Sequence, residues 1–197
     1  MPRLILASTS PRRRELLGAL GLPFEIQPSA FDEDAVPVGD GGPEEWVVTL
    51  AAGKALAVAL QVQGSALVIG ADTTVVLDGT CLGKPKDPMD ACRTLRSLSG
   101  RTHTVCTGLA LIQVEDGEPH PPITDVVSTE VTFDELTDEV IEAYVATGEP
   151  LDKAGSYGIQ GKALSFIPRI NGDYFNVVGL PLNRLVALLN QFGVSVW

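Results

Sequence analysis

The chain has 197 residues, of which 45% are hydrophobic, and a formal net charge of −11. A chain of this length and apolar content can bury a sizeable core, so we expect one domain spanning residues 1–197. The excess of acid disfavours broad binding to nucleic acid or to acidic membranes, although a polyanion can still enter a local basic pocket. No apolar run of about eighteen residues occurs, and no charged leader followed by an apolar stretch precedes the first predicted strand. We therefore expect a cytoplasmic protein without a membrane partner.

Cysteine and histidine give no sign of a metal centre. The three cysteines stand in apolar contexts without the spacing of zinc ligands or of a disulfide framework, which is typical of a reducing compartment. The two histidines, His103 and His120, are too few and too isolated for a metal cluster. His103 follows a polar turn, so we expect it to be a hydrogen-bonding residue of the surface or of that turn.

The beginning of the chain predicts a strand, a tight turn and a helix. The apolar run Leu4–Ala7 has no alternation, which is typical of a strand buried on both faces. Ser10 can cap the following helix, Pro11 suits its first position, and Gly21 ends it. The apolar stripe of this helix consists of Leu16, Leu17 and Leu20.

Three consecutive arginines, Arg12, Arg13 and Arg14, fall in the first turn of this helix. A helix N-terminus carries a partial positive charge, so each cation there costs roughly 0.3–1 kcal/mol. The conflict disappears if an anion binds at this end, where it meets free backbone N–H groups, arginine forks and the hydroxyl of Ser8. We therefore predict a phosphate site here. The alternative is a solvated basic turn.

The next segment predicts a half-buried strand at residues 24–27, a loop at 28–42 and a helix at 43–63. The loop contains three adjacent acids, Asp32-Glu33-Asp34, which by themselves indicate only solvated surface. Lys54 interrupts an almost uncharged part of the helix. Its ammonium group either serves a site or simply extends to solvent along an apolar stem, and the sequence favours neither.

An aspartate interrupts the most apolar part of the chain. The run of residues 66–71 ends at Asp72, a second apolar run follows, and Asp78-Gly79 predicts a hairpin turn. Burying a carboxylate between two such runs is costly without a partner or a metal ion. We interpret Asp72 as functional because strand ends in α/β sheets carry sites. The alternative is a structural aspartate with a capping role.

The rest of the chain keeps alternating between strands and helices, so the sequence predicts a mixed α/β fold. A second hairpin is expected at Asn171-Gly172, between strands at 166–170 and 174–178. The glycine-interleaved stretch 152–161 indicates either close approach of the backbone to a ligand or an irregular loop. The other predicted elements are strands at 105–114 and 123–133 and helices that begin at Asp87, Thr137 and Pro181.

Taken together, these stretches resemble the Maf family of nucleoside triphosphate pyrophosphatases. The resemblance covers nearly the whole chain in order, on residues 6–13, 70–73, 83–85, 98–100, 149–161 and 176–182. It implies an elongated mixed sheet with two lobes around a central cleft, similar to inosine triphosphate pyrophosphatases. It also implies a metal-dependent cut between the α and β phosphates, which releases a nucleoside monophosphate and pyrophosphate, and a homodimer.

The resemblance also assigns roles to residues of the predicted site. It implies that Asp72 is the general base for the attacking water and that Glu33 is a supporting acid or metal ligand. Asp72 and Glu33 would then hold the divalent ion, magnesium or alternatively manganese, together with substrate phosphates. The residues expected to bind substrate are Ser8, Arg13, Glu33, Lys54 and Lys84.

Three further residues match the branch of the family that prefers dTTP and UTP over 7-methyl-GTP: Arg12, Thr73 and Gln160. A glutamine can both donate and accept, which suits the O4/N3–H edge of uracil or thymine. The chain departs from the family at Gly53, where a longer polar residue is usual. Glycine inside a helix costs about 1 kcal/mol, so we expect it to loosen the neighbouring Lys54.

A rival hypothesis is a nucleotide-binding regulator of cell division, because family members are associated with inhibition of septum formation. Asp72 separates the two hypotheses. A pure binder gains little from a carboxylate that faces a polyanion, whereas a hydrolase needs a base or a metal ligand there. The sequence therefore favours catalysis.

Overall fold

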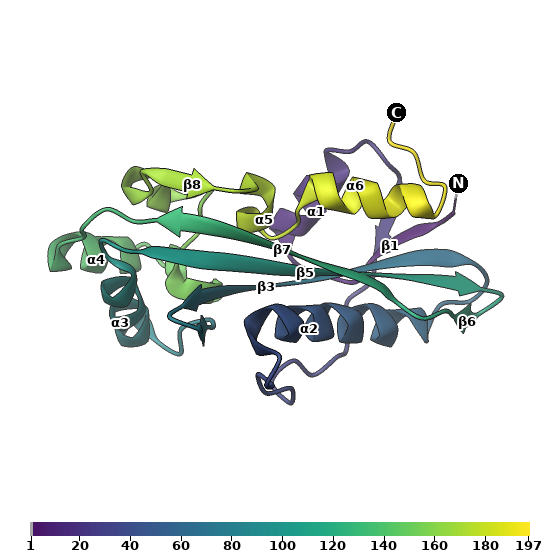
Figure 1. The fold of residues 1–197 in the computed structure, drawn as a ribbon, viewed down its shortest axis with the longest axis horizontal. Helices are drawn as coiled ribbons and strands as arrows, with labels where there is room; N and C mark the ends of the chain where they lie inside the picture. The colour runs from purple at the N-terminus through teal and green to yellow at the C-terminus, as the bar shows by residue number, and fades with distance from the viewer. Residues whose placement is uncertain (1) are drawn as a thin grey trace.

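The computed structural model describes residues 2–197 and contains one mixed sheet at its centre. The strand order is β2-β1-β3-β5-β7-β8, with β4 beside β3 and β6 beside β5 (Figure 1). β1 is parallel to β2 and β3, and the remaining pairs are antiparallel. The strands are β1 (Leu4–Leu6), β2 (Phe24–Ile26), β3 (Ala66–Leu77), β4 (Thr80–Leu82), β5 (Thr102–Glu115), β6 (Glu118–Pro119), β7 (Ile123–Thr132) and β8 (Arg169–Asn171).

Helices cover both faces of this elongated sheet. α2 lies along one face, α1, α5 and α6 lie on the other, and α3 and α4 pack near the end away from α6 (Figure 1). The α-helices are α1 (Pro11–Gly18), α2 (Gly42–Ala59), α3 (Pro88–Leu98), α4 (Asp138–Val145), α5 (Tyr174–Val178) and α6 (Leu182–Gln191). Three 3₁₀ turns are η1 (Glu149–Asp152), η2 (Ala154–Ser156) and η3 (Lys162–Phe166). Within residues 2–197, no helix has both the length and the apolar character needed to cross a membrane.

The alternation of strand residues sorts the core into layers. Leu4, Leu67 and Ile69 belong to the cluster that includes α1 and α6, whereas Ile5 and Val68 pack with α2. A third cluster joins α3 and α4 to the other end of the sheet through side chains that include Val75, Leu95, Phe133 and Ile141. The mixed α/β prediction is therefore confirmed, with a core on each face of the sheet.

Two glycines let α2 approach the sheet closely. A Cβ atom on Gly70 would lie 2.2 Å from the carbonyl oxygen of Ala51, and one on Gly108 would lie 2.4 Å from that of Val47. Any other residue at either position would push the helix away. Asp72 lies on the same face of β3 as Gly70, because side chains alternate along a strand. Its carboxylate is thereby placed within reach of α2.

β3 pairs with one strand along one edge and with two separate strands along the other. β5 pairs with β3 from Ala66 to Val76. Along the opposite edge, β1 pairs with residues 67–69 and β4 pairs with residues 75–77. Among residues 2–197, no strand pairs with residues 70–74 on that edge. The sheet is therefore open there, and this opening is the base of the central cleft that the sequence predicted.

The hairpin predicted at Asn171-Gly172 is wrong. Residues 174–178 form helix α5, because the Asp173 carboxylate accepts hydrogen bonds from the backbone N–H groups of Phe175 (2.7 Å) and Asn176 (3.3 Å). On the other side only Arg169–Asn171 pairs as a strand, with β7. The helix predicted at 43–63 also ends earlier than expected, at Ala59.

Candidate active site

A cleft of about 900 Å³ opens at the unpaired edge of β3. Its walls come from the β1–α1 turn, the loop before α2, α2 itself, the turn after β4 and the η1–η3 region. Every site residue predicted from the sequence lines this cleft: Ser8, Arg12, Arg13, Glu33, Lys54, Asp72, Thr73, Lys84 and Gln160. The structure thus brings together side chains that span most of the chain.

Lys54 joins two carboxylates at the α2 wall of the cleft. Its Nζ lies 2.5 Å from Oδ1 of Asp72 and 2.8 Å from Oε2 of Glu33. Lys54 and Asp72 are both only 7% exposed. The interpretation that Lys54 merely extends to solvent is therefore wrong, and the view of residues 32–34 as only solvated surface does not hold for Glu33. The carboxylates compensate a buried ammonium group that would otherwise be costly.

The electrostatic state of Glu33 follows from this contact. Its partial burial alone would raise the carboxyl pKa. The hydrogen bond and positive charge of Lys54, together with Lys84 and Arg13, outweigh burial and lower the pKa below its usual value. Glu33 is therefore ionised at neutral pH and carries a full negative charge at the mouth of the cleft.

Gly53 holds the Glu33 loop in place instead of loosening Lys54. A Cβ atom on Gly53 would lie 2.4 Å from ring carbons of Phe31. The missing side chain lets the Phe31 ring pack directly onto α2, two residues before Glu33. The predicted loosening is therefore wrong, because the glycine allows the loop to bring a second carboxylate to Lys54.

Arg13 approaches the cleft from the other face of β3. Its Nε donates to the carbonyl oxygen of Gly179 (2.8 Å), Nη2 donates to Oγ1 of Thr73 (3.0 Å), and Nη1 lies 3.5 Å from Oγ of Ser8. Burial lowers the pKa of this guanidinium, whereas the charges of Asp72 and Glu33 raise it. Arg13 is thus fixed by hydrogen bonds, unlike the exposed Arg14. The alternative interpretation, a solvated basic turn, therefore does not hold for Arg13.

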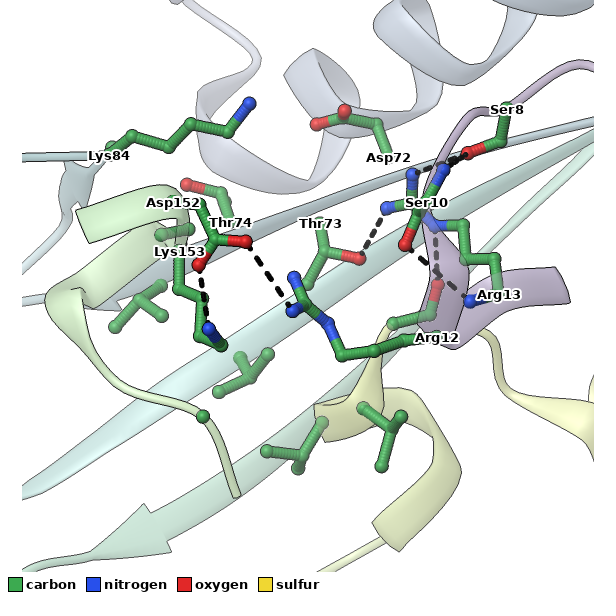
Figure 2. A pocket seen from close by; sticks show the side chains of 18 of the residues that line it. Ser8, Ser10, Arg12, Arg13, Asp72, Thr73, Thr74, Lys84, Asp152 and Lys153 are labelled. Carbon is green, nitrogen blue, oxygen red and sulfur yellow. Dashed lines mark hydrogen bonds and ion pairs between the residues drawn. The ribbon is translucent and has the colours of Figure 1, made fainter. Parts of the chain in front are cut away.

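Arg12 extends toward the opposite wall of the cleft. Figure 2 shows its guanidinium directed at Asp152, and the distance from Nη1 to Oδ2 is 3.9 Å. Lys153 binds the same carboxylate through Oδ1 at 2.6 Å. Partial burial would raise the pKa of Asp152, but Lys153 and Arg12 lower it. The sequence did not single out Asp152, although it lies within the motif of residues 149–161.

Lys84 and Gln160 are both exposed at the rim of the cleft. A single backbone contact ties their two loops together: the N–H of Gly155 donates to the carbonyl oxygen of Gly83 at 3.1 Å. Gly155 has φ +67°, and a Cβ atom there would lie 2.6 Å from Val75. Gly155 therefore allows close packing against the Val75 side chain, which is neither of the two predicted reasons, approach to a ligand or an irregular loop.

His103 is buried and contacts a cleft residue. It is 2% exposed, its Nε2 lies 2.8 Å from the hydroxyl oxygen of Tyr157, and Tyr157 lines the cleft. Burial lowers the pKa of His103 to about 4, so the ring is neutral at physiological pH. The expectation of a surface or turn histidine is wrong. β5 begins at Thr102, earlier than predicted, and this places His103 inside the sheet.

The Maf-like protein family model matches residues 3–192 of this chain. The chain belongs to the Maf family. A relative from Moorella thermoacetica, named "dTTP/UTP pyrophosphatase", is 56% identical, with 100% of this chain and 98% of the relative covered. One from Symbiobacterium thermophilum with the same name is 49% identical, with 100% and 97% covered. A third, from Clostridium botulinum strain 657, also has this name and is 49% identical over 100% of both chains.

Solved structures with a similar fold include the Ham1 protein of Staphylococcus aureus. It has a TM-score of 0.47 and 16% identity, with 96% of this Maf chain and 99% of that chain covered. A dITP/XTP pyrophosphatase from Mycobacterium abscessus has a TM-score of 0.44 and 12% identity, with 97% and 95% covered.

The carboxylates of the Maf cleft determine whether it can hold a metal ion. Within residues 2–197, no group of three or more His, Cys, Asp or Glu side chains is arranged to hold a metal by itself. The carboxylates of Asp72 and Glu33 nevertheless lie close enough together that both contact the ammonium group of Lys54. Two carboxylates suit Mg²⁺, which completes its coordination with water and substrate phosphates. The residues present therefore fit a divalent ion whose coordination is completed by water and substrate phosphates.

Proposed function

We propose that this protein hydrolyses dTTP and UTP to the nucleoside monophosphate and pyrophosphate. The observation that carries the proposal is the cluster of Asp72, Lys54 and Glu33 opposite Arg13 in one cleft. The cluster supplies a carboxylate base and the cations for a polyphosphate within the same space. Relatives that are about half identical over their full length are named for this activity.

The chemistry that the chain's own residues offer is proton transfer and charge stabilisation. The water oxygen bonds to one phosphorus of the α–β anhydride, and the bridging oxygen leaves with the other phosphorus. Asp72 accepts a proton from that water. Among residues 2–197, Asp72 makes its side-chain hydrogen bond to Lys54 through Oδ1, so Oδ2 is available for water. Arg13, Lys54 and Lys84 stabilise the charge that accumulates on the phosphate oxygens.

Asp72 and Glu33 would hold the divalent ion, Mg²⁺ in our proposal, with Mn²⁺ as the alternative. A bound divalent ion neutralises phosphate charge and polarises phosphoryl oxygens. The ammonium group of Lys54, which contacts both carboxylates, would be the chain's own cation next to the phosphate oxygens. The homodimer implied by the family resemblance also remains a prediction.

The proposed reaction is tested by pyrophosphate release from a panel of nucleotides in the presence of magnesium. We expect kcat/KM for dTTP and UTP to exceed that for CTP by roughly tenfold or more, because a mismatched buried polar group costs about 1–3 kcal/mol. Equal values for UTP and CTP, or a preference for 7-methyl-GTP, would contradict the substrate assignment. Nucleotide binding without any pyrophosphate release would favour the rival regulator.

Asp72→Asn tests the base within the same assay. The change keeps the shape of the side chain but removes its proton-accepting charge, so turnover should fall by about 10²–10⁴ with a modest change in nucleotide affinity. Asp78→Asn is the matched control, because Asp78 follows the same strand but is exposed and pairs with Arg101. Near-normal turnover of Asp72→Asn would exclude Asp72 from the mechanism.

A further inference from the structure

A directional chain of hydrogen bonds runs from Arg13 across the sheet to helix α5. Nη2 of Arg13 lies 3.0 Å from Oγ1 of Thr73, which lies 2.9 Å from Oγ1 of Thr107. Thr107 Oγ1 lies 3.0 Å from the backbone carbonyl oxygen of Asn176. Arginine can only donate and a carbonyl can only accept, so all three bonds form together in one direction alone. Thr73 accepts from Arg13 and donates to Thr107, which donates to Asn176.

The far end of this chain is firmly anchored. Asn176 is fully buried, and its Nδ2 donates to the carbonyl oxygen of Val105 and to Oγ1 of Thr129, both at 2.9 Å. These bonds fasten α5 to β5 and β7. Gly179, just after α5, has φ +120° and supplies the carbonyl oxygen that accepts from Nε of Arg13. Two edges of the guanidinium are thus held from one segment of the chain, one directly by Gly179 after α5 and one through two hydroxyl groups by Asn176 in α5.

Thr107 is buried behind the cleft and does not line it. It is 0% exposed and is not among the residues that line the cleft, whereas Thr73 and Arg13 are. Without the Thr107 hydroxyl, the proton of Thr73 has no acceptor behind the strand and must turn toward the cleft or toward Arg13. A proton turned toward Arg13 occupies the place of the bond from Nη2, whereas a proton turned toward the cleft leaves that lone pair free but no longer holds the hydroxyl in one orientation.

We propose that Thr107 is a positioning residue that orients the Arg13 guanidinium toward the substrate phosphates through Thr73. This inference rests on the proposed function, because it assigns Arg13 to a polyphosphate. It also defines what Thr73 offers to a bound nucleotide. The Thr73 hydroxyl proton is committed to Thr107, so the side chain presents only a lone pair and a methyl group to the cleft.

The test is a double-mutant cycle read by calorimetric binding of inorganic tripolyphosphate without added metal. Thr107→Val keeps the side-chain shape and removes both hydrogen bonds, so the dissociation constant should rise about tenfold. In an Arg13→Ala background the same change should alter it by less than about twofold, because the residue it acts through is gone. Thr107→Ser retains the hydroxyl and should bind within about twofold of the wild type.

A matched control lies on the same strand. Oγ1 of Thr102 makes a 2.9 Å hydrogen bond to Oγ1 of Thr132 at the exposed end of β5, and neither residue lines the cleft. Thr102→Val measures the effect of losing any threonine pair on this strand, and the Thr107→Val effect must exceed it. Three results would overturn the proposal: no loss of affinity, an equal loss in both backgrounds, or a Thr107→Ser variant as weak as Thr107→Val.

Two further measurements test the proposal if the Thr107→Val variant is unstable or if the wild type has no pyrophosphatase activity. If Thr107→Val melts below the assay temperature, proton NMR of the wild type should show a slowly exchanging Thr73 hydroxyl, although that side chain is only half-buried. Exchange at the rate of a free hydroxyl would overturn the positioning role. If the wild type releases no pyrophosphate from dTTP or UTP, the proposed function fails while tripolyphosphate binding still decides the role of Thr107.

Discussion

Asp72 and Thr73 are neighbours in the sequence, and their side chains leave β3 on opposite faces. Asp72 therefore meets Lys54 under α2, whereas Thr73 meets Arg13 beside α1 and α5. At an ordinary position in a sheet these two groups would be separated by the strand. Here the edge of β3 is open between residues 70 and 74, so a ligand at that edge can contact both faces.

His103 provides a pH-dependent test at the scale of one side chain. Its pKa is about 4 in the folded protein against 6.5 for the ordinary value, so the unfolded chain binds the proton more readily. The contribution of the neutral buried ring is fully present above pH 6.5 and is lost as the pH falls toward 4. It amounts to about 3 kcal/mol. Urea unfolding at pH 7 and 4.5 should therefore show a smaller stability difference for His103→Gln than for the wild type.

The control for that measurement is His120→Gln, which removes an imidazole that is half-exposed and pairs with Glu115. We expect this variant to keep the wild-type dependence of stability on pH. If His103→Gln also kept it, His103 would not be held neutral by burial, and its contact with Tyr157 would have another explanation.

The sequence predicted the types of the site residues better than their contacts. The clash of three arginines with a helix N-terminus predicted a phosphate site there, which stays a prediction, and Arg13 lines the cleft. Local pattern could not show that Gly179 holds Arg13, because that contact joins residues 166 positions apart. For Lys54 the sequence did not distinguish a site residue from a side chain that extends to solvent. The ammonium group is buried only because carboxylates from a separate loop and strand contact it.

At the scale of elements, the strongest predictions came from segments whose pattern and turn chemistry agree. The buried strand Leu4–Leu6, helix α1 with its Ser10 cap, and the hairpin between β3 and β4 are all confirmed. The failure at residues 174–178 has a local cause. An Asn-Gly pair signals a hairpin, but Asp173 immediately after it caps a helix, and the cap decided the outcome.

Helix α1 is joined to α5 by Arg13, and this leads to a prediction about stability. Removing the positive charge from the helix N-terminus should by itself stabilise the protein by only about 0.3–1 kcal/mol. Arg13→Ala also removes the donors to Gly179 and Thr73, so we expect a net loss of about 1–2 kcal/mol in unfolding free energy and weaker tripolyphosphate binding. Lys84→Ala should weaken binding several-fold without a change in stability, because Lys84 is exposed at the rim.

Thermal melts and calorimetry of the free proteins check this contrast, with Arg14→Ala as the control from the same helical turn. Arg14 is exposed and should affect neither property. An Arg13→Ala protein as stable as the wild type would mean that the contacts between α1 and α5 contribute nothing to folding, and that Arg13 serves only the ligand.

At the scale of the whole molecule, the cleft is lined by two sets of residues. Asp72, Lys54 and Arg13 gather where α1, α2 and β3 meet, whereas Gln160 and the Asp152–Lys153 pair belong to the turns that follow α4. The two sets are joined across the opening by Arg12, whose guanidinium faces Asp152 (Figure 2). Sequence spacing alone could not place these sets on opposite walls, because their arrangement depends on β1 and β4 sharing one edge of β3.

This separation predicts that base choice and phosphate binding respond to different substitutions. Gln160→Ala removes a side chain that can match the O4/N3–H edge of uracil, so the preference for UTP over CTP should fall from roughly tenfold toward one. Tripolyphosphate affinity should stay unchanged, since Gln160 is an uncharged side chain exposed at the rim of the cleft. Gln191→Ala is the control, because Gln191 is exposed at the end of α6 and does not line the cleft. Competition kinetics with mixed UTP and CTP measure the ratio directly. An unchanged ratio would show that the base is read elsewhere, and the first candidate is then Arg12, whose donors favour the carbonyl of uracil over the amino group of cytosine.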